Sequence, residues 1–222
     1  MTALVRAFAF QVACSIAILT TAWRMYTRDP SFPAFTMAAL AKQAGLAKGT
    51  LYLYFRTKEE LFLALLENGF NAWFDVLDTR LDAGGTEWTP EDATEVIVRS
   101  IRGRETLARL LSILPTIVEH NVDYDAALRF KRQVMRRADV TGHRLEARLP
   151  FLRPGEGARL LVHLHALVIG VWQLAEPSPV IRRVMETPEL APARVDFEED
   201  LRFLLATLLA GMRTAAAARP ET

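Results

Sequence analysis

Hydrophobic residues recur every three or four positions along most of the chain, a spacing that is typical of amphipathic helices. One stretch alternates instead, because residues 51–55 have the order Leu-Tyr-Leu-Tyr-Phe expected of a half-buried strand. An isolated five-residue strand would have no partner in a helical chain, so a short helix is the better prediction. The pattern therefore predicts an all-α protein.

Helix-breaking and helix-capping residues divide this pattern into segments. Pro30 ends a first helix, Thr36 is a suitable N-cap for the second, and Gly45 follows as a turn residue. Thr57 and Glu60 have the spacing of a capping box. After the first helix we expect helices at residues 37–44, 48–55, 58–81, about 90–103, 105–120, 124–149, 158–175 and 197–217, with a proline-containing connector between the last two.

The first helix is unusually apolar, since residues 7–23 carry no charge. This run is short for a bilayer span, which needs about 20 residues, so no membrane is predicted. A secretory signal peptide is the weaker alternative. We expect a helix that buries one stripe of apolar residues, made of Phe8, Val12, Ile16, Leu19 and Trp23.

Composition and charge narrow the prediction further. The 222 residues include one cysteine, Cys14, which excludes an internal disulfide framework and fits a reducing, cytoplasmic location. No Cys/His cluster has metal-ligand spacing, so neither a metal nor a cofactor is predicted. The net charge is only +1, but residues 1–58 contain seven basic residues and one acidic residue. Such asymmetry is expected when one end of a protein meets a polyanion.

Residues 36–55 have the layout of a helix-turn-helix, with two short helices joined at Gly45. In the second helix Leu51 and Phe55 are four residues apart and face inward, which directs Tyr52 outward. A helix of this kind fits the DNA major groove, with its first residues near the base edges and its hydroxyl groups near phosphate oxygens. The pattern thus indicates a nucleic-acid-binding segment.

The sequence Ala-Leu-Ala-Lys-Gln-Ala-Gly-Leu-Ala-Lys-Gly-Thr-Leu-Tyr-Leu-Tyr-Phe-Arg-Thr-Lys-Glu-Glu-Leu, residues 39–61, resembles the DNA-binding motif of TetR-family transcriptional repressors. The resemblance implies a helix-turn-helix head at residues 1–57 and a helical effector-binding and dimerisation body at residues 58–222. The apolar start departs from the family pattern, which leaves three interpretations of residues 1–15 open: misassigned, disordered, or packed differently as an irregular part of the first helix. The DNA contacts that the resemblance implies are Thr36, Ala47, Lys48, Gly49, Thr50, Tyr52, Tyr54 and Lys58.

The resemblance also implies a homodimer that binds a palindromic operator on double-stranded DNA and leaves it when a small molecule binds the body. The last two long helices would form the dimer interface, since a helix that is apolar on two faces needs a partner for each face. A helix buried within one subunit is the alternative. The interface residues expected are Leu160, Leu164, Leu167, Val171, Leu201, Leu204, Leu205 and Leu208.

An effector pocket is expected among the helices of the body. Most of the residues expected to line this pocket are apolar, which predicts an uncharged, apolar or amphipathic effector. For each aromatic residue or methionine, an ordinary core position is the favoured alternative. The pocket candidates are Trp73, Phe74, Ile113, Ile117, Met135, His163, His165 and Trp172.

Enzymatic activity is not predicted. The serines lack the glycine context of a nucleophile elbow, and no glycine-rich phosphate loop follows a strand. Acidic pairs such as Glu59-Glu60 lie in first turns of predicted helices, where the helix dipole favours them. The remaining alternative to a DNA-binding regulator is a helical interaction module that has lost DNA binding.

Overall fold

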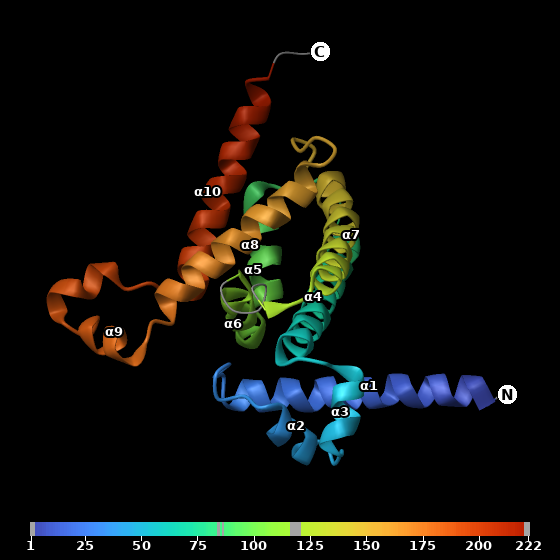
Figure 1. The fold of residues 1–222 in the computed structure, drawn as a ribbon. Helices are drawn as coiled ribbons and strands as arrows, with labels where there is room; N and C mark the ends of the chain where they lie inside the picture. The colour runs from blue at the N-terminus through green and yellow to red at the C-terminus, as the bar shows by residue number, and fades with distance from the viewer. Residues whose placement is uncertain (1–2, 84, 86, 116–120, 220–222) are drawn as a thin grey trace. The chain divides into compact units, whose positions relative to one another are not determined.

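The computed structural model describes residues 3–83, 85, 87–115 and 121–219, with side chains from residue 9 onward. Every regular element in these ranges is helical, which confirms the all-α prediction (Figure 1). The elements are α1 (Ala3–Arg28), α2 (Met37–Gln43), α3 (Lys48–Tyr54), α4 (Lys58–Ala83), α5 (Pro90–Ile101), α6 (Glu105–Ile113), α7 (Tyr124–Arg148), α8 (Glu156–Ala175), α9 (Pro179–Val184), the 3-10 helix η3 (Pro188–Ala193) and α10 (Phe197–Ala217).

Local signals set most helix boundaries as expected. Gly45 and Gly103 have φ angles of 68° and 75°, left-handed values that glycine adopts without strain, and they follow α2 and α5. Helix α1 is continuous from Ala3, so residues 3–15 are a regular part of it. The prediction missed α9 and η3, which lie inside the connector and both carry proline in the first turn.

The chain folds into two compact units. The first unit comprises residues 1–68 and 113–130, and the second comprises residues 69–112 and 131–222. Helices α4 and α7 contribute residues to both units. The domain boundary predicted at residue 57 stays a prediction.

The core of the first unit is built around Phe62 of α4, which is fully buried. The ring centroids of Tyr26, Phe32 and Phe35 lie 5.1, 4.7 and 5.1 Å from that of Phe62, and all three pairs are edge-to-face. Edge-to-face pairs bring the positive rim of one ring to the negative face of another and stabilise beyond simple burial. This cluster fixes α1 and the segment before α2 against the start of α4.

The buried stripe predicted for α1 is wrong. Val12 and Ile16 are exposed, Leu19 and Trp23 are only half-buried, and the side chain of Phe8 lies outside the described residues. Helix α1 is apolar on several faces, so spacing alone does not tell which face meets the core. The large side chains and the alanine that α1 buries are Ile18, Ala22 and Tyr26.

A buried carboxylate fixes α7 against α4 in the second unit. Asp78 accepts a hydrogen bond of 2.7 Å from the Thr141 hydroxyl. The guanidinium groups of Arg144 and Arg137 lie 2.7 and 3.3 Å from its other oxygen. A buried charge is tolerated only when it is paired and hydrogen-bonded, so this network specifies the register of the two helices.

Helices α7 and α8 cross where two glycines meet, Gly142 and Gly157. A Cβ atom built on Gly157 would lie 2.1 Å from the carbonyl oxygen of Gly142, closer than any side chain permits. Beside this contact, Oε1 of Glu146 accepts hydrogen bonds from the backbone N–H groups of Gly155 and Gly157, at 2.8 and 2.9 Å. This cap lets α8 begin two residues before the predicted start.

By length and composition, α8 is the one helix in the described part of the chain that could cross a membrane. The core helix of a folded protein passes the same test. One side of α8 is buried in the second unit, through Leu160, Leu161, Leu164 and Val168 among others. We therefore interpret α8 as a core helix.

Candidate nucleic-acid interface

Helices α2 and α3 pack against each other as the helix-turn-helix pattern requires. Thr36 caps α2, because its Oγ1 accepts a hydrogen bond of 3.2 Å from the N–H of Ala39. Gly45 makes the turn, after which the N–H of Leu46 donates to the carbonyl of Ala41 at 2.9 Å. The hydroxyl hydrogen of Thr36 stays available to an external acceptor.

Residues 51–55 are helical as predicted, since α3 runs to Tyr54 with Phe55 as its C-cap. Leu51 and Phe55 are buried, which confirms the inward face predicted from their spacing. Tyr52 is 39% exposed and Leu53 is 83% exposed. A leucine held in water at this level has no packing role within the chain, and it offers an apolar contact such as a thymine methyl.

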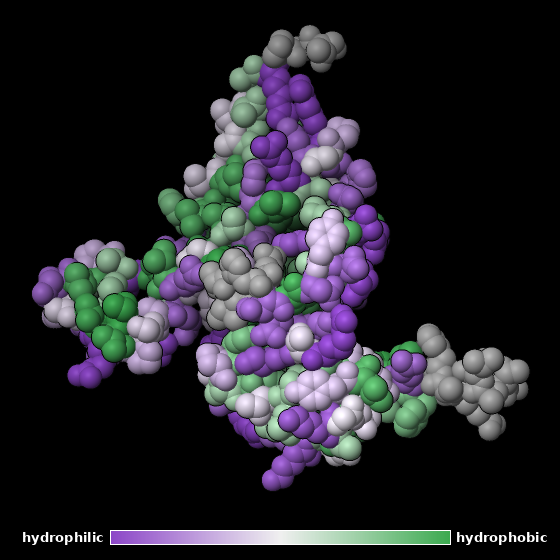
Figure 2. Space-filling model, viewed as in Figure 1, coloured by the Kyte–Doolittle hydropathy of each residue, from purple (hydrophilic) through white to green (hydrophobic). Residues whose placement is uncertain are grey.

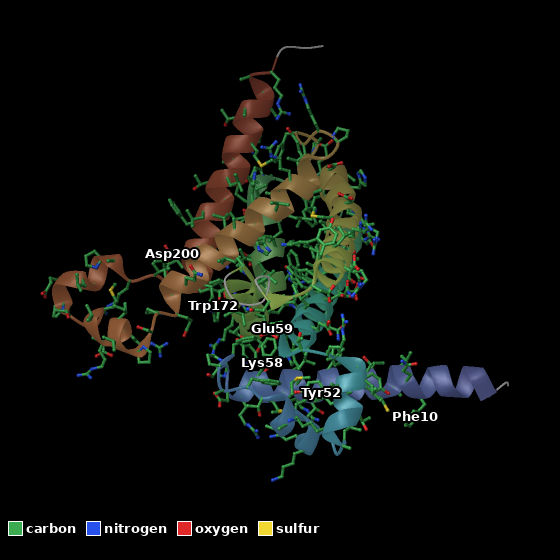
Figure 3. The ribbon with its side chains drawn as sticks, in the orientation of Figure 1. Phe10, Tyr52, Lys58, Glu59, Trp172 and Asp200 are labelled. Atoms are coloured by element: carbon green, nitrogen blue, oxygen red, sulfur yellow. The ribbon has the colours of Figure 1, made fainter. Side chains whose placement is uncertain are left out.

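The outward face of α3 combines a cation, a phenol and a bare stretch of backbone. The Lys48 ammonium lies 5.9 Å from the centroid of the Tyr52 ring, and both residues are exposed. Tyr52 is labelled in Figure 3. Gly49 is exposed between them in sequence, while Thr50 is half-buried. Ala47 is the exposed N-cap of α3 and makes no side-chain cap hydrogen bond.

Tyr54 differs from the expectation that both tyrosine hydroxyls are free for phosphate. Tyr54 is half-buried, and its phenol lies near the Cys14 thiol of α1. Desolvation, followed by the interaction with this thiol, raises the pKa of the Tyr54 phenol. Tyr54 therefore has a neighbour in α1, a proximity that the sequence alone does not reveal.

Lys58 also has a partner inside the first unit. The ammonium of Lys58, which is labelled in Figure 3, donates a hydrogen bond of 2.8 Å to the carbonyl oxygen of Phe32 and lies 4.0 Å from the centroid of the Phe32 ring. A lysine placed in this way closes the segment before α2 onto the start of α4. Lys58 therefore helps to position the helix-turn-helix, and its contact with a DNA phosphate stays a prediction.

The predicted capping box at the start of α4 forms in an altered version. The Glu60 N–H donates to the Thr57 hydroxyl at 3.1 Å, but the Glu60 carboxylate accepts from the N–H of Arg56, at 2.9 Å, where a standard box uses that of Thr57. The Arg56 guanidinium also pairs with Asp123 at 2.9 Å. Asp123 caps α7 through the N–H of Ala126, and this hydrogen bond is the main cause of its lowered pKa.

Several basic side chains of the first unit are open to solvent. Arg24, Arg28, Lys42, Lys48 and Arg56 are all exposed. Solvent-exposed cations on a compact helix-turn-helix provide the sequence-independent part of DNA affinity, which comes from release of phosphate counterions. The geometry and the charge thus fit a duplex-binding surface.

Two family models together match most of the chain. Residues 18–65 match the model described as "Bacterial regulatory proteins, tetR family", and residues 67–216 match "Tetracyclin repressor-like, C-terminal domain". The chain belongs to the TetR family. It is therefore a DNA-binding transcriptional regulator, as the motif at residues 39–61 predicted.

Two solved structures are similar to this TetR-family chain. A transcriptional regulator from Rhodococcus sp. Rha1 is 17% identical, with a TM-score of 0.54 over 89% of this chain and 96% of that chain, and it shares the fold. The MbdR regulator from Azoarcus sp. CIB is 19% identical, with a TM-score of 0.42 over 94% of this chain and all of that chain. No curated protein matches the sequence.

Gly49 is a position in this TetR-family head where the fold does not need glycine but DNA binding is expected to need it. A Cβ on Gly49 would have no heavy atom within 4 Å, and its φ is not positive, so the fold does not require glycine. We expect Gly49→Ala to stabilise α3 by up to about 1 kcal/mol, since glycine is a poor helix former. If DNA approaches the backbone here, the same change weakens operator binding, by about 10-fold for a contact worth about 1.4 kcal/mol.

Thermal unfolding and a mobility shift on one protein sample measure the two effects of Gly49→Ala together. Stabilisation with weaker operator binding is the expected combination. If the variant is stabilised and its operator binding is unchanged, Gly49 does not contact DNA.

The predicted effector-pocket residues do not form one site. Trp73 and Phe74 are buried with ring centroids 4.8 Å apart, and the Trp73 indole donates to Ser100 at 2.8 Å. His165 stacks on Phe70 at 6.1 Å, and Phe70 stacks on Phe74. These contacts support the alternative of an ordinary aromatic core.

The other pocket candidates are dispersed. Met135 is exposed on α7, so it does not line an enclosed site. His163 is half-buried on α8, Ile113 belongs to the first unit, and Ile117 lies outside the described residues. Trp172 is buried elsewhere, against Phe197 at 5.2 Å.

A cavity of about 220 Å³ lies in the second unit beside Trp172. Its lining differs from the apolar pocket that the sequence predicted, because four carboxylates and one guanidinium contribute to it. Glu198 is paired with Arg102 and has a lowered pKa, and the hydrogen bond from Arg102 is the main cause. The lining residues are Val98, Ile101, Arg102, Gly103, Glu105, Trp172, Glu176, Asp196, Phe197, Glu198 and Leu201.

Five of the eight predicted dimer-interface residues are buried in a single chain, so they leave no surface for a partner. The periodicity correctly found apolar faces but assigned the inward face to the interface. The residues that belong to the core of the second unit are Leu160, Leu164, Val171, Leu201 and Leu205. Leu167 and Leu208 are half-buried, and Leu204 is exposed.

Three exposed apolar residues of the last two long helices were not among the predicted interface residues. They are Val162 and Leu174 on α8 and Phe203 on α10, and Phe203 is 67% exposed. The predicted residue Leu204, next to Phe203 in the chain, is exposed as well. These four exposed residues are called the outer face of α8 and α10.

Proposed function

We propose that this protein is a homodimeric repressor that binds a palindromic operator and leaves it when a small molecule binds the helical body. The observation that carries the DNA-binding half of the proposal is the exposed face of α3, with Lys48, Gly49, Tyr52 and Leu53 outward over a core of Leu51 and Phe55. Regulators of this family bind DNA operators and dimerise, and they are generally not enzymes.

The outer face of α8 and α10 supports the homodimer. Four exposed apolar residues on two neighbouring helices lose contact with water when a second copy covers them, and burial of apolar area favours association. A twofold dimer presents the same surface from both copies, so one apolar patch is sufficient. Two heads related in this way require two half-sites related by the same symmetry.

The effector half of the proposal is supported by the cavity beside Trp172 and by the match of residues 67–216 to a tetracycline-repressor-like domain. An effector lowers operator affinity only by the difference between its affinities for the free and the DNA-bound conformation. The polar lining of the cavity favours an amphipathic effector over a purely apolar one.

Footprinting on the DNA upstream of the protein's own gene tests the operator. We expect two protected half-sites with twofold symmetry, about 34–36 Å or a multiple of this apart along the duplex. An unrelated duplex of equal length is the control. Equal affinity for both duplexes, or no binding to either, would favour a helical interaction module that has lost DNA binding.

A thermal-shift screen tests release by an effector. A compound that raises the unfolding temperature by binding the native state is expected to lower operator affinity in a mobility shift. Compounds that stabilise the protein and leave operator affinity unchanged would contradict release by an effector, without affecting the operator result.

A further inference from the structure

The 21 residues 176–196 between α8 and α10 form an arm that buries nothing of its own. Neither α9 nor η3 contains a buried residue. Val180 of α9 is 71% exposed, and Ile181 and Val184 are also exposed. These three aliphatic side chains are one and four positions apart, so they gather on one side of a helical turn.

The arm is held in shape without a core. Arg182 pairs with Glu176 at 2.9 Å across the start of α9. The Arg194 guanidinium donates to the carbonyl of Met185 at 2.7 Å, and the Thr187 hydroxyl donates to that of Val184 at 2.6 Å. Four of its 21 residues are prolines, which restrict the unfolded chain and lower the entropy lost on ordering.

An ordered segment with exposed aliphatic side chains is prepared for a partner. Preorganisation stabilises a complex because little freedom remains to be lost on binding. Figure 1 shows α9 standing away from α5, α6 and α7 of the same unit. Figure 2 shows hydrophobic residues gathered on the arm, at the left of the view.

The position of the arm in the chain indicates which partner covers it. The arm leaves α8 just after exposed Leu174 and returns to α10 two turns before exposed Phe203. The arm therefore connects the two helices that carry the outer face of α8 and α10. A partner that covers that face is within reach of the arm.

The charge of the arm argues against a polyanionic partner. It contains three arginines and four acidic residues, Glu176, Glu186, Glu189 and Asp196. Segments that bind an anionic membrane surface or nucleic acid carry an excess of basic residues. A protein surface with exposed aliphatic and aromatic side chains is the better match.

We propose that the arm of each subunit clasps the outer face of α8 and α10 on a second copy of this chain. This inference rests on the homodimer proposed above and adds a contact to it. Twofold symmetry gives two equivalent clasps for each dimer, so every change in the arm acts twice.

Sedimentation of a variant with Val180→Ser, Ile181→Ser and Val184→Ser tests the clasp. We expect the dimer dissociation constant to rise about 100-fold, since six aliphatic side chains in the dimer would lose buried apolar area. The matched control carries Phe10→Ser, Val12→Ser and Ile16→Ser, three exposed apolar residues of α1. It is expected to dimerise like the wild type.

A photo-crosslinking amino acid at Ile181 gives a second measurement that does not depend on the stability of the triple variant. The expected product has the mass of a dimer, with the crosslink mapped to α8 or α10 of the other subunit. Crosslinks confined to one chain, together with an unchanged dissociation constant, would overturn the clasp and leave the homodimer standing. If the wild type sediments as a monomer, both the clasp and the homodimer are contradicted.

Discussion

Gly157→Ala is expected to destabilise the fold strongly. The new Cβ would lie 2.1 Å from the carbonyl oxygen of Gly142 and 2.9 Å from its Cα. Backbone atoms cannot rotate away as a side chain does, so α7 and α8 must separate. Overpacking costs of about 3 kcal/mol or more follow, which corresponds to a fall of roughly 6–12 °C in the unfolding temperature.

Gly170→Ala on the same helix is the matched control. A Cβ at Gly170 has no heavy atom within 4 Å in the chain, and Gly170 lies in the interior of α8. Calorimetry should show an unchanged or raised unfolding temperature, because alanine favours the helix by up to about 1 kcal/mol. If Gly157→Ala and Gly170→Ala unfold at the same temperature, the close crossing of α7 and α8 is not correct.

The helix-turn-helix could be predicted from the sequence because its determinants are local. Leu51 and Phe55 define an inward face by their spacing alone, and Gly45 marks the turn by its conformational freedom. Thr36 is recognisable as a cap because its partner, the N–H of Ala39, is three residues away. Each of these features needs only neighbours along the chain.

Contacts between distant residues could not be predicted in this way. Tyr54 meets Cys14, and Lys58 donates to Phe32, across separations of 40 and 26 residues. Both side chains therefore appeared free to contact DNA. Their actual partners depend on how α1 and the segment before α2 pack, which no local pattern determines.

In helices that are apolar on several faces, hydrophobic periodicity fails to predict the buried face for a different reason. In α1, Ile16 and Ile18 are the same residue type, yet Ile16 is exposed and Ile18 is buried. On α10, Leu204 is exposed and Leu205 is buried. Hydropathy assigns equal value to both neighbours, and only the packing of the other helices decides which one is covered.

The missed helix α9 is a case where a local signal was present. Ser178 followed by Pro179 is a good start for a helix, with a capping hydroxyl and a proline at the first position. The other prolines of the segment pointed to an irregular connector. Capping residues therefore deserve more weight than proline content when a short helix is expected between two longer ones.

The combined change Lys48→Ala with Tyr52→Ala is expected to abolish sequence-specific operator binding. Each dimer would lose four side chains from the exposed face of α3, two from each head. A contact to a base or phosphate contributes about 1–3 kcal/mol, so affinity should fall at least about 1000-fold. The fold should not change, because neither side chain is buried.

The matched control also removes one tyrosine and one lysine, but from α7. It carries Tyr124→Ala and Lys131→Ala, and both residues are exposed. Its charge equals that of the test variant, so a general electrostatic effect would weaken both proteins equally.

Mobility shifts at several salt concentrations also distinguish a phosphate contact of Lys48 from a base contact. Loss of two phosphate contacts makes the dependence of log affinity on log salt shallower by about 2, whereas loss of base contacts leaves the slope unchanged and relaxes specificity. If the α3 variant retains specific binding, α3 is not the DNA-binding surface.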